Sequence, residues 1–369
     1  MGSAPDLTNA RRVLIVKLSA LGDIVHALPV AAALRERFPH LEIDWVAEAP
    51  CSDILQGSPV LRTVHSIVRR KRAERFRPAA ITDFRELARR LRRERYDVAL
   101  DLQGLTKSAV IAASSGASVR LGYDWLREAA PYLVRRVRRR PESLHIVDQL
   151  LDVARHLGAR PESVRFPLHI APEEEEAAAS LLASAGVAAD APYLVVNPTD
   201  GGGGGYKGLP PAKLADVLDR VTDRTGLPWV MVGGPGDRAL AEETRARARA
   251  LVADLVGRTS LKHLAAVIRG ARLHLSGDTG SSHVAVAVGT PPVAVFSRSN
   301  PERVGPYGYA RNVVHARHRC CERCRRMHDT APINSTSKCL GPPPACLEAV
   351  TADAVVAAAL QALAAGGEA

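Results

Sequence analysis

The sequence predicts an α/β protein with two Rossmann-like domains whose parallel sheets face a central cleft. The chain has 369 residues, more than one ordinary hydrophobic core accommodates, which favours two domains. Apolar, strand-like runs alternate with helical patterns in both halves, as expected of parallel α/β sheets. A proline-bounded acidic helix between residues 169 and 192 separates the two series. We therefore expect domains over residues 1–175 and 176–348, and a C-terminal helix over 349–369 that packs back on the body.

In the first half, strands are predicted where apolar residues run together, and helices where apolar residues recur at helical spacing. Pro39 ends the first helix, and Gly158 provides a C-terminal cap for the last one. The strands are expected at 12–18, 42–48 and 97–104, and the helices at 29–39, 84–96 and 145–158.

The second half repeats this alternation. Its segments lie at 193–198, 212–226, 228–234, 238–255, 261–271, 273–278, 283–289 and 291–296. A final helix over 351–366 begins with Thr351 as its N-terminal cap. Ligands of open α/β sheets bind outside the carboxyl ends of the strands, so functional residues are expected in the turns after each strand.

Composition and charge limit the classes of function. With 46% hydrophobic and 24% charged residues the chain is globular, and its start lacks an apolar signal core, so we expect a cytoplasmic protein. The formal net charge is +11, with basic runs at 68–78, 89–95 and 134–141. Such an excess suits nucleic acid, an anionic membrane surface or an anionic substrate, or consists of solvated helix faces. Aromatic residues, which stack on bases, make up only 4%, which disfavours nucleic acid.

An isolated carboxylate follows the first strand. The strand leads into a turn of small residues, 19–22, and then to Asp23, with a helical pattern directly after it. A glycine-rich phosphate loop often occupies this position. Its absence indicates that phosphate is bound in the other domain and that Asp23 has another role.

Two turns in the second half suit a phosphorylated ligand. The first, 197–211, contains five consecutive glycines and Lys207, whose charge suits a phosphate; a floppy surface loop is the alternative. It is not a Walker A loop, because Gly208 stands where serine or threonine is required. The second follows Gly233 and ends at Asp237, which could accept ribose hydroxyls or cap the next helix.

A third turn ends a strand at Gly277 and starts a helix of small residues. The free N–H groups at such a helix start bind anions. We expect the amides of Thr279 and Gly280 to face the anion, and Asp278 to orient the turn or meet a hydroxyl. His283, further along the helix, is either a ligand contact or a buried imidazole.

Four blocks of the sequence together resemble glycosyltransferase family nine. They are VLIVKLSALGDIVHALP, YDVALDLQGLTKSA, YKGLP preceded by NPT, and DTGSSHVAVAVGTPPVAVF followed by NPERVGPYG. The blocks occur in order between Val13 and Gly308 and so cover most of the chain. Within the family, the resemblance is strongest to the heptosyltransferase I members.

The resemblance implies an inverting GT-B enzyme that transfers heptose from ADP-L-glycero-β-D-manno-heptose to Kdo of the lipopolysaccharide inner core, with no metal or cofactor required. It implies that Asp23 is the general base and that Lys207 meets the donor diphosphate. The implied further donor contacts are Thr199, Asp237, Asp278, Thr279, Gly280 and His283, and the implied acceptor contacts are Arg69, Arg120, Gln103 and Lys107. The acceptor, anionic Kdo-lipid A, implies peripheral binding at the cytoplasmic face of the inner membrane and no nucleic-acid partner.

The chain departs from the family pattern near the donor. Leu209 replaces a tryptophan, the glycine run obscures the alignment of Thr199, and SRSNP after Phe296 brings in Arg298. These departures leave open another donor or acceptor on the same fold. A nucleotide-sugar 2-epimerase or a basic binding protein without catalysis are the further alternatives.

Five of the six cysteines crowd into residues 320–346. Cys321 and Cys324 form a CxxC pair, which Cys339 and Cys346 could complete to a structural zinc site. The wider spacing of the second pair suits unmetallated thiols instead, and a cytoplasmic location disfavours disulfides.

Overall fold

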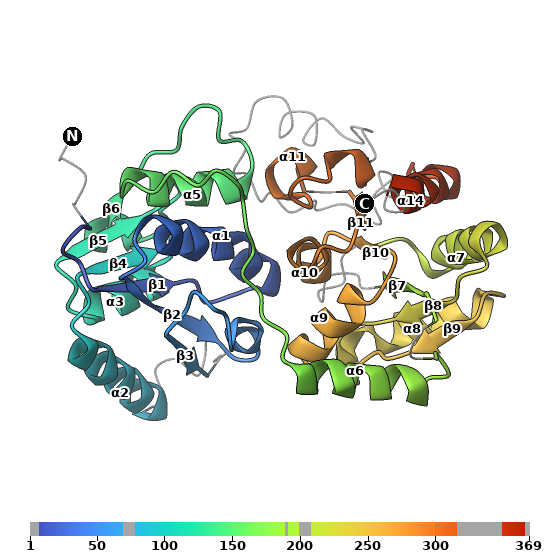
Figure 1. Ribbon diagram of the computed structural model, residues 1–369, viewed down its shortest axis with the longest axis horizontal. Helices are drawn as coiled ribbons and strands as arrows, with labels where there is room; N and C mark the ends of the chain where they lie inside the picture. The colour runs from blue at the N-terminus through green and yellow to red at the C-terminus, as the bar shows by residue number, and fades with distance from the viewer. Residues whose placement is uncertain are drawn as a thin grey trace. The chain divides into compact units, whose positions relative to one another are not determined.

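The computed structural model describes residues 7–68, 78–188, 191–198, 208–297, 299–315 and 349–365. The chain divides into two compact units, Met1–His169 and Ile170–Ala369, each built around its own parallel sheet (Figure 1). This division precedes helix α6 (Pro172–Ser184), whereas the sequence suggested a boundary inside it. The whole of α6 belongs to the second unit because it packs on helix α9 (Leu261–Arg269).

The first unit contains a six-stranded parallel sheet in the order β3-β2-β1-β4-β5-β6. The strands are β1 (Arg12–Val16), β2 (Glu42–Glu48), β3 (Thr63–Ile67), β4 (Val98–Asp101), β5 (Val119–Gly122) and β6 (Arg135–Arg136). The helices are α1 (Leu21–Arg37), α2 (Pro78–Glu94), α3 (Thr106–Ser114), α4 (Ala130–Leu133) and α5 (Ile146–His156), with a 3-10 turn η1 (Cys51–Leu55).

Helices cover both faces of this sheet. α1 packs on α5, and α2 packs on α3. Leu14 of β1 lies in one core cluster with Leu87 and Leu91 of α2. Because successive side chains of a strand point to opposite faces, the fully buried Val13 and Ile15 point away from this cluster. Burial on both faces explains why β1 reads as a continuous apolar run.

The second unit also contains a six-stranded parallel sheet, in the order β12-β11-β10-β7-β8-β9. The strands are β7 (Leu194–Asn197), β8 (Trp229–Met231), β9 (Val252–Asp254), β10 (His274–Gly277), β11 (Pro292–Phe296) and β12 (Val313–His315). Besides α6 and α9, the helices are α7 (Pro211–Thr225), α8 (Arg238–Arg247), α10 (Gly280–Val288), α11 (Pro301–Val304) and α14 (Ala352–Ala365), with 3-10 turns η3 (Pro235–Asp237) and η4 (Ala310–Asn312).

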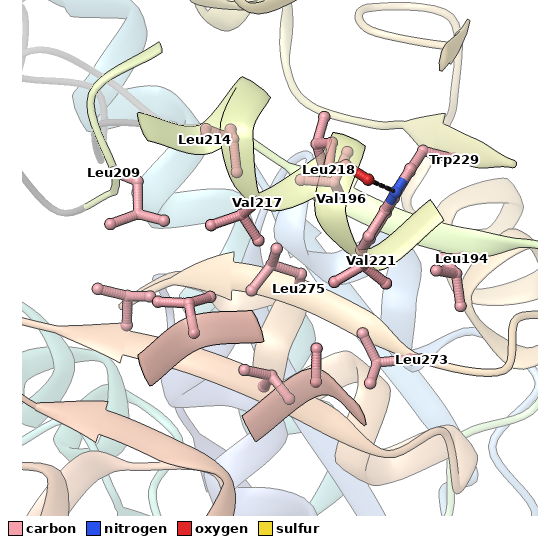
Figure 2. Close-up of a cluster of buried hydrophobic side chains, with 14 of the residues drawn as sticks. Leu194, Val196, Leu209, Leu214, Val217, Leu218, Val221, Trp229, Leu273 and Leu275 are labelled. Atoms are coloured by element: carbon pink, nitrogen blue, oxygen red, sulfur yellow. Dashed lines mark hydrogen bonds between the residues drawn. The ribbon is translucent and has the colours of Figure 1, made fainter. Parts of the chain in front are cut away.

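A large core cluster of the second unit joins its sheet to α7. Leu218 and Val221 of α7 share this cluster with Val196 of β7 and Trp229 of β8 (Figure 2). The indole N–H of Trp229 donates to the carbonyl oxygen of Leu218 at 3.2 Å, so the one polar group of this buried ring is satisfied.

The C-terminal helix α14 is part of the second unit. It packs on α7, β11 and β12, and Val355, Val356 and Ala359 are buried in the cluster described above. Lys213 of α7 donates to the carbonyl oxygen of Val350 at 2.7 Å, just before α14 begins. No helix among the described residues has the length and apolar character needed to cross a bilayer.

In both sheets, successive strands are first added on one side of the first strand and then on its other side. In the first unit the chain proceeds outward from β1 to β2 and β3, then returns to place β4 on the other side of β1. The second unit repeats this order from β7 to β8 and β9, and then to β10. The turns after β1 and β4, and those after β7 and β10, therefore lie side by side at topological switch points, where α/β proteins bind ligands.

Several short elements differ from the sequence-based expectation. β3, β5, β6 and β12 have no counterpart among the expected strands, because they are two to five residues long and lie toward the sheet edges. The segment 238–255 divides into α8 and β9. Helix α1 begins at Leu21 and includes Pro29, because every residue from Ile24 to Leu34 is buried and packing outweighs the lost hydrogen bond.

Candidate active site

Asp23 stands in the first turn of α1, at the switch point of the first unit. Its Oδ2 accepts a hydrogen bond from the backbone amide of Ala20 at 3.2 Å. The side chain is 48% exposed. An acid in the first turn also interacts favourably with the positive end of the helix dipole. The carboxylate is thus held by its own turn and remains accessible to a ligand.

Lys17 is a buried cation next to Asp23. Its side chain is 4% exposed, and its Nζ lies 3.8 Å from Oδ1 of Asp23. Nζ also donates to the carbonyl oxygen of Leu102 at 2.9 Å and lies 6.0 Å from the ring centroid of Tyr123. Lys17 therefore connects the ends of β1 and β4 and places positive charge beside the exposed carboxylate.

Asp101, the last residue of β4, is a fully buried acid at the same edge of the sheet. Its Oδ1 accepts hydrogen bonds from the backbone amides of Gln103 and Gly104, at 3.0 and 2.9 Å. Burial raises the pKa of Asp101, although the amide of Gly104 and the charge of Lys17 act in the opposite direction. Asp101 thereby fixes the turn after β4.

Gln103 connects this turn to the one that carries Asp23. Its Oε1 accepts hydrogen bonds from the backbone amides of Leu18 and Ser19, at 3.1 and 3.3 Å. The resemblance implied an acceptor contact for Gln103. In the structure its side-chain oxygen binds the backbone of the Asp23 turn.

Lys107 also lies at this edge, in the first turn of α3, and forms an ion pair with Glu48 at the end of β2. The Glu48 side chain is 6% exposed and that of Lys107 33%, so the carboxylate is shielded from water while the ammonium group is partly accessible. Burial lowers the pKa of Lys107. The backbone amide of Glu48 donates to the carbonyl oxygen of Leu18 at 2.9 Å, which links the pair to the Asp23 turn.

The structure does not bring Arg120 to this edge. Its Nε donates to the carbonyl oxygen of Leu133 and its Nη1 to that of Ala117, both at 3.0 Å. Ala117 precedes β5, so the guanidinium lies toward the amino end of that strand, whereas Asp23 follows the carboxyl end of β1. Arg69, the other arginine expected at the acceptor, lies outside the described residues.

At the switch point of the second unit, the end of β7 is hydrogen-bonded to the start of α10. Asn197 Nδ2 donates to Ser281 Oγ at 3.1 Å, and Ser281 Oγ lies 2.8 Å from Oγ1 of Thr279. Thr279 is the N-cap residue of α10, which begins at Gly280. The N–H groups of the first helical turn and the positive end of the dipole therefore lie at the switch point, where they suit an anionic group such as a phosphate.

Asp278 and His283 flank this helix start. Oδ2 of Asp278 accepts a hydrogen bond from Ser299 Oγ at 2.5 Å, which connects the turn to the loop after β11. This contact agrees with the expectation that Asp278 orients the turn. His283 is 5% exposed, which favours the buried imidazole over an extensive ligand contact.

Asp237 binds its own turn, because its Oδ2 accepts a hydrogen bond from the backbone amide of Gly234 at 2.8 Å. Asp237 is also the N-cap residue of α8, but its side chain makes no capping hydrogen bond to that helix, so the carboxylate holds the turn before α8. Thr199 and Lys207, expected at the donor phosphates, lie outside the described residues, as does Arg298.

No group of three or more His, Cys, Asp or Glu side chains able to hold a metal ion occurs in the described part of the chain. The cysteines of the suggested zinc cluster, Cys321, Cys324, Cys339 and Cys346, lie outside that part. The structural zinc site and its unmetallated alternative therefore both stay predictions.

Three residues at these edges were not singled out from the sequence: Glu48, Asp101 and Asn197. Each is the last residue of a buried strand, namely β2, β4 and β7. A polar residue that ends an otherwise apolar parallel strand lies where ligands bind, and this signal could have identified all three.

Solved structures share this architecture. The chain superposes on the glycosyl transferase family 9 protein of Veillonella parvula with a TM-score of 0.80, at 22% identity, over 98% of this chain and 99% of that one. It superposes on E. coli heptosyltransferase WaaC with ADP-2-deoxy-2-fluoro heptose with a TM-score of 0.67, at 25% identity, over 93% and 97% of the two chains. The two parallel-sheet units thus define the GT-B class of glycosyltransferases.

The sequence comparisons narrow this class. The family model of glycosyltransferase family 9 (heptosyltransferase) matches residues 84–333. Lipopolysaccharide heptosyltransferase 1 of Pseudomonas aeruginosa is 31% identical over 308 residues, which cover 82% of this chain and 83% of that protein. The chain belongs to glycosyltransferase family 9 and is an enzyme of the heptosyltransferase type.

Proposed function

We propose that this protein transfers heptose from ADP-L-glycero-β-D-manno-heptose to Kdo of the lipopolysaccharide inner core. The observation that carries the proposal is the half-exposed carboxylate of Asp23, held by Ala20 beside Lys17 at the switch point of the first unit. The name of the P. aeruginosa relative supports lipopolysaccharide as the acceptor class. The heptose nucleotide in the E. coli WaaC structure supports the donor.

In this mechanism Asp23 is the general base. It removes the proton of a Kdo hydroxyl as the hydroxyl oxygen attacks the anomeric carbon of the heptose. The bond between that carbon and the diphosphate oxygen breaks at the same time, and ADP leaves with the electron pair. A single displacement of this kind inverts the anomeric configuration.

The second unit stabilises the leaving group in the proposed reaction. Negative charge develops on the diphosphate as ADP departs, and preorganised N–H groups at the start of α10, after Thr279, offset it. Lys207 adds a positive charge from the segment that precedes α7. In the proposed mechanism these groups offset the charge of the diphosphate, and no metal ion is required.

The proposed acceptor is Kdo-lipid A, which the enzyme reaches by peripheral binding to the cytoplasmic face of the inner membrane. The formal net charge of +11 supports an anionic lipid partner over a neutral one. Lys107, at the same sheet edge as Asp23, is the proposed contact for the acceptor carboxylate.

Replacement of Asp23 tests the mechanism. With ADP-heptose and Kdo-lipid A, we expect Asp23→Asn to lower kcat by about 10²–10⁴-fold, the range for loss of a general base, and to leave ADP-heptose binding unchanged by calorimetry. Glu36→Gln is the matched control, because Glu36 is an exposed acid on the same helix at its opposite end. Wild-type turnover by Asp23→Asn would refute the role of Asp23.

The donor nucleotide is tested separately. Calorimetric titration of the wild-type protein with ADP, UDP and GDP compares the three nucleotides under one condition. We expect ADP to bind most tightly. Preferential binding of UDP would refute the heptose donor while leaving the glycosyltransferase class intact.

A further inference from the structure

The first half of α2 continues an apolar stripe beyond the hydrophobic core. Leu87 and Leu91 of this helix are buried in the core of the first unit. Ile81 and Phe84, which precede them, are 44% and 37% exposed. Residues three, four and seven apart share one face of a helix, so these four side chains form a continuous stripe of which only the second half is covered.

Exposed large hydrophobic side chains are unevenly distributed over the described residues. Three of the seven, Val68, Ile81 and Phe84, flank the connection from β3 to α2, and Val68 is 65% exposed. Three others lie elsewhere in the first unit, and only Leu251 belongs to the second. Among the described residues, the end of β3 and the first half of α2 thus hold the largest group of exposed, large apolar side chains.

The topology directs this part of α2 toward the catalytic edge. β3 and β4 lie in the same parallel sheet, and α2 connects the carboxyl end of β3 to the amino end of β4. A crossover between parallel strands must return from the carboxyl edge to the amino edge. The exposed first half of α2 therefore lies toward the edge where Asp23 stands, and Figure 1 shows α2 next to α3 on the sheet.

Exposed arginines border the apolar stripe. This half of the helix also carries the exposed acids Asp83 and Glu86. Arg85 follows Ile81 by four residues and so borders the stripe, and Arg89, four residues further on, is exposed on the face turned away from the core. The charge of the whole unit has the same sign. Residues 1–169 contain 29 Lys and Arg against 19 Asp and Glu, whereas residues 170–369 contain 21 against 20.

We propose that the first half of α2 docks on an anionic lipid surface. Ile81 and Phe84 enter the boundary between headgroups and acyl chains, while Arg85 and Arg89 meet lipid phosphates, as in amphipathic helices that lie in a membrane interface. An anionic polymer such as nucleic acid would match the arginines but not the apolar pair. The docking itself does not depend on the proposed function. Its role does, because docking would bring the edge that carries Asp23 to a lipid-linked acceptor.

Vesicle binding by the full chain tests the proposal. The wild-type protein is sedimented with vesicles of phosphatidylcholine alone and of phosphatidylcholine containing phosphatidylglycerol. We expect binding to the anionic vesicles only. Ile81→Gln/Phe84→Gln and Arg85→Gln/Arg89→Gln should each weaken that binding by about tenfold or more, since a basic group near the surface alone contributes about fivefold.

Two matched controls belong to the second unit. Leu251→Gln removes an exposed apolar side chain, 67% exposed, and Arg224→Gln removes an exposed arginine. Both should bind vesicles as the wild type does. Glutamine retains helix propensity, so unchanged circular dichroism and melting temperature of the α2 variants would show that they remain folded.

Three results would overturn the proposal. They are absence of wild-type binding to anionic vesicles, wild-type binding by both α2 variants, and loss of binding in the arginine variant alone. The last result would indicate general charge attraction without insertion of Ile81 and Phe84. Tighter binding of a single-stranded oligonucleotide that depends on the same arginines would equally reject lipid as the partner.

Activity assays separate this inference from the proposed function. With a water-soluble Kdo acceptor, the α2 variants should keep the wild-type kcat/KM. With acceptor embedded in anionic vesicles, their kcat/KM should fall about tenfold, in line with the lost binding. If the wild type turned over neither acceptor, the proposed function would fail, while sedimentation would still decide the docking of α2.

Discussion

Oε1 of Gln103 accepts a hydrogen bond from the backbone amide of Ser19 at 3.3 Å, and so joins the turns after the two central strands of the first sheet. The second unit has a corresponding connection, in which Asn197 at the end of β7 donates to Ser281 in the first turn of α10. In both units a polar side chain after one central strand holds the turn after the other. The geometry of each ligand-facing turn is thus fixed across the switch point.

The contact of Gln103 predicts a positioning role. Gln103→Met has a similar side-chain length but no acceptor for the amides of Leu18 and Ser19. We expect kcat to fall by about 10- to 100-fold, because displacement of a catalytic group by about 1 Å costs rate more than binding. Steady-state kinetics should show the KM values for both substrates close to those of the wild type.

Gln103→Glu supplies the control for this prediction, since it retains an oxygen that can accept both hydrogen bonds. Its kcat should exceed that of Gln103→Met. A different pattern, in which Gln103→Met raises the acceptor KM and leaves kcat unchanged, would identify Gln103 as an acceptor ligand instead.

Much of this arrangement could be predicted from the sequence. β1, β2, β4 and β7 are buried on both faces, so their apolar runs stand out, and the turn that carries Asp23 follows directly from β1. The turn that carries Thr279 follows β10, another fully buried strand. The partners of these residues were harder to predict. Gln103 lies more than 80 residues from Ser19 in sequence, and the pairing depends on β4 returning beside β1.

The direction of the Arg120 side chain was also hard to predict from the sequence. The motif around it places an arginine near the acceptor, but the direction of its side chain is set by the carbonyl groups of Ala117 and Leu133. Sequence proximity to a site motif does not determine toward which edge of a strand a long side chain turns.

Ser281→Ala tests the corresponding connection in the second unit. The substitution removes the hydroxyl that bridges Asn197 and Thr279. We expect ADP to bind about 3- to 10-fold more weakly, the effect of one lost hydrogen bond on the preorganisation of the site. Calorimetry measures this change, and Ser180→Ala on the exposed side of α6 is the control. Unchanged ADP affinity in Ser281→Ala would separate this turn from the donor.

We predict that the hydrogen-bonded carboxylate of Asp44 stabilises the folded first unit. This fully buried carboxylate pairs with Arg62 and accepts a hydrogen bond from the Tyr96 hydroxyl at 2.6 Å. Burial alone would raise the pKa of Asp44, but hydrogen bonds from His65, Arg62 and Tyr96 hold it below its ordinary value of 3.8. We expect Tyr96→Phe to lower the free energy of unfolding by about 1.5–3 kcal/mol at pH 7, the range for hydrogen bonds to charged groups.

The sign of the pH dependence follows from the lowered pKa of Asp44. The unfolded state binds a proton at higher pH than the folded state, so the contribution is complete above pH 3.8 and declines as pH falls below it. Hydrogen exchange of β2 and β3 amides measures the free energy. Tyr132→Phe, at a side chain 90% exposed, should have no effect. Wild-type protection in Tyr96→Phe would contradict the role of this network.

Buried His274 is neutral in the folded protein, whereas Asp44 is charged. Both residues nevertheless make the folded state less stable as the pH falls. The residue is fully buried at the start of β10, and its ring nitrogens have no hydrogen-bond partner among the described residues. Burial lowers the pKa of His274 to about 3; an interaction with its own backbone acts in the opposite direction, and the charge of His283 lowers the pKa further. The folded protein therefore keeps this imidazole neutral, while the unfolded chain binds a proton at the ordinary histidine pKa of 6.5.

Between pH 7 and pH 5 this difference should destabilise the second unit by about 2 kcal/mol, because the unfolded state gains the proton that the folded state excludes. His274→Leu removes the titrating group and keeps the site apolar, so the variant should lose about 2 kcal/mol less than the wild type over that range. Hydrogen exchange of β7 and β10 amides at the two pH values measures both changes. His40→Leu, at an exposed histidine of the first unit, should follow the wild-type curve. Parallel curves for His274→Leu and wild type would mean that the buried imidazole finds a proton-stabilising partner in the folded state, and that the second unit owes its acid sensitivity to other groups.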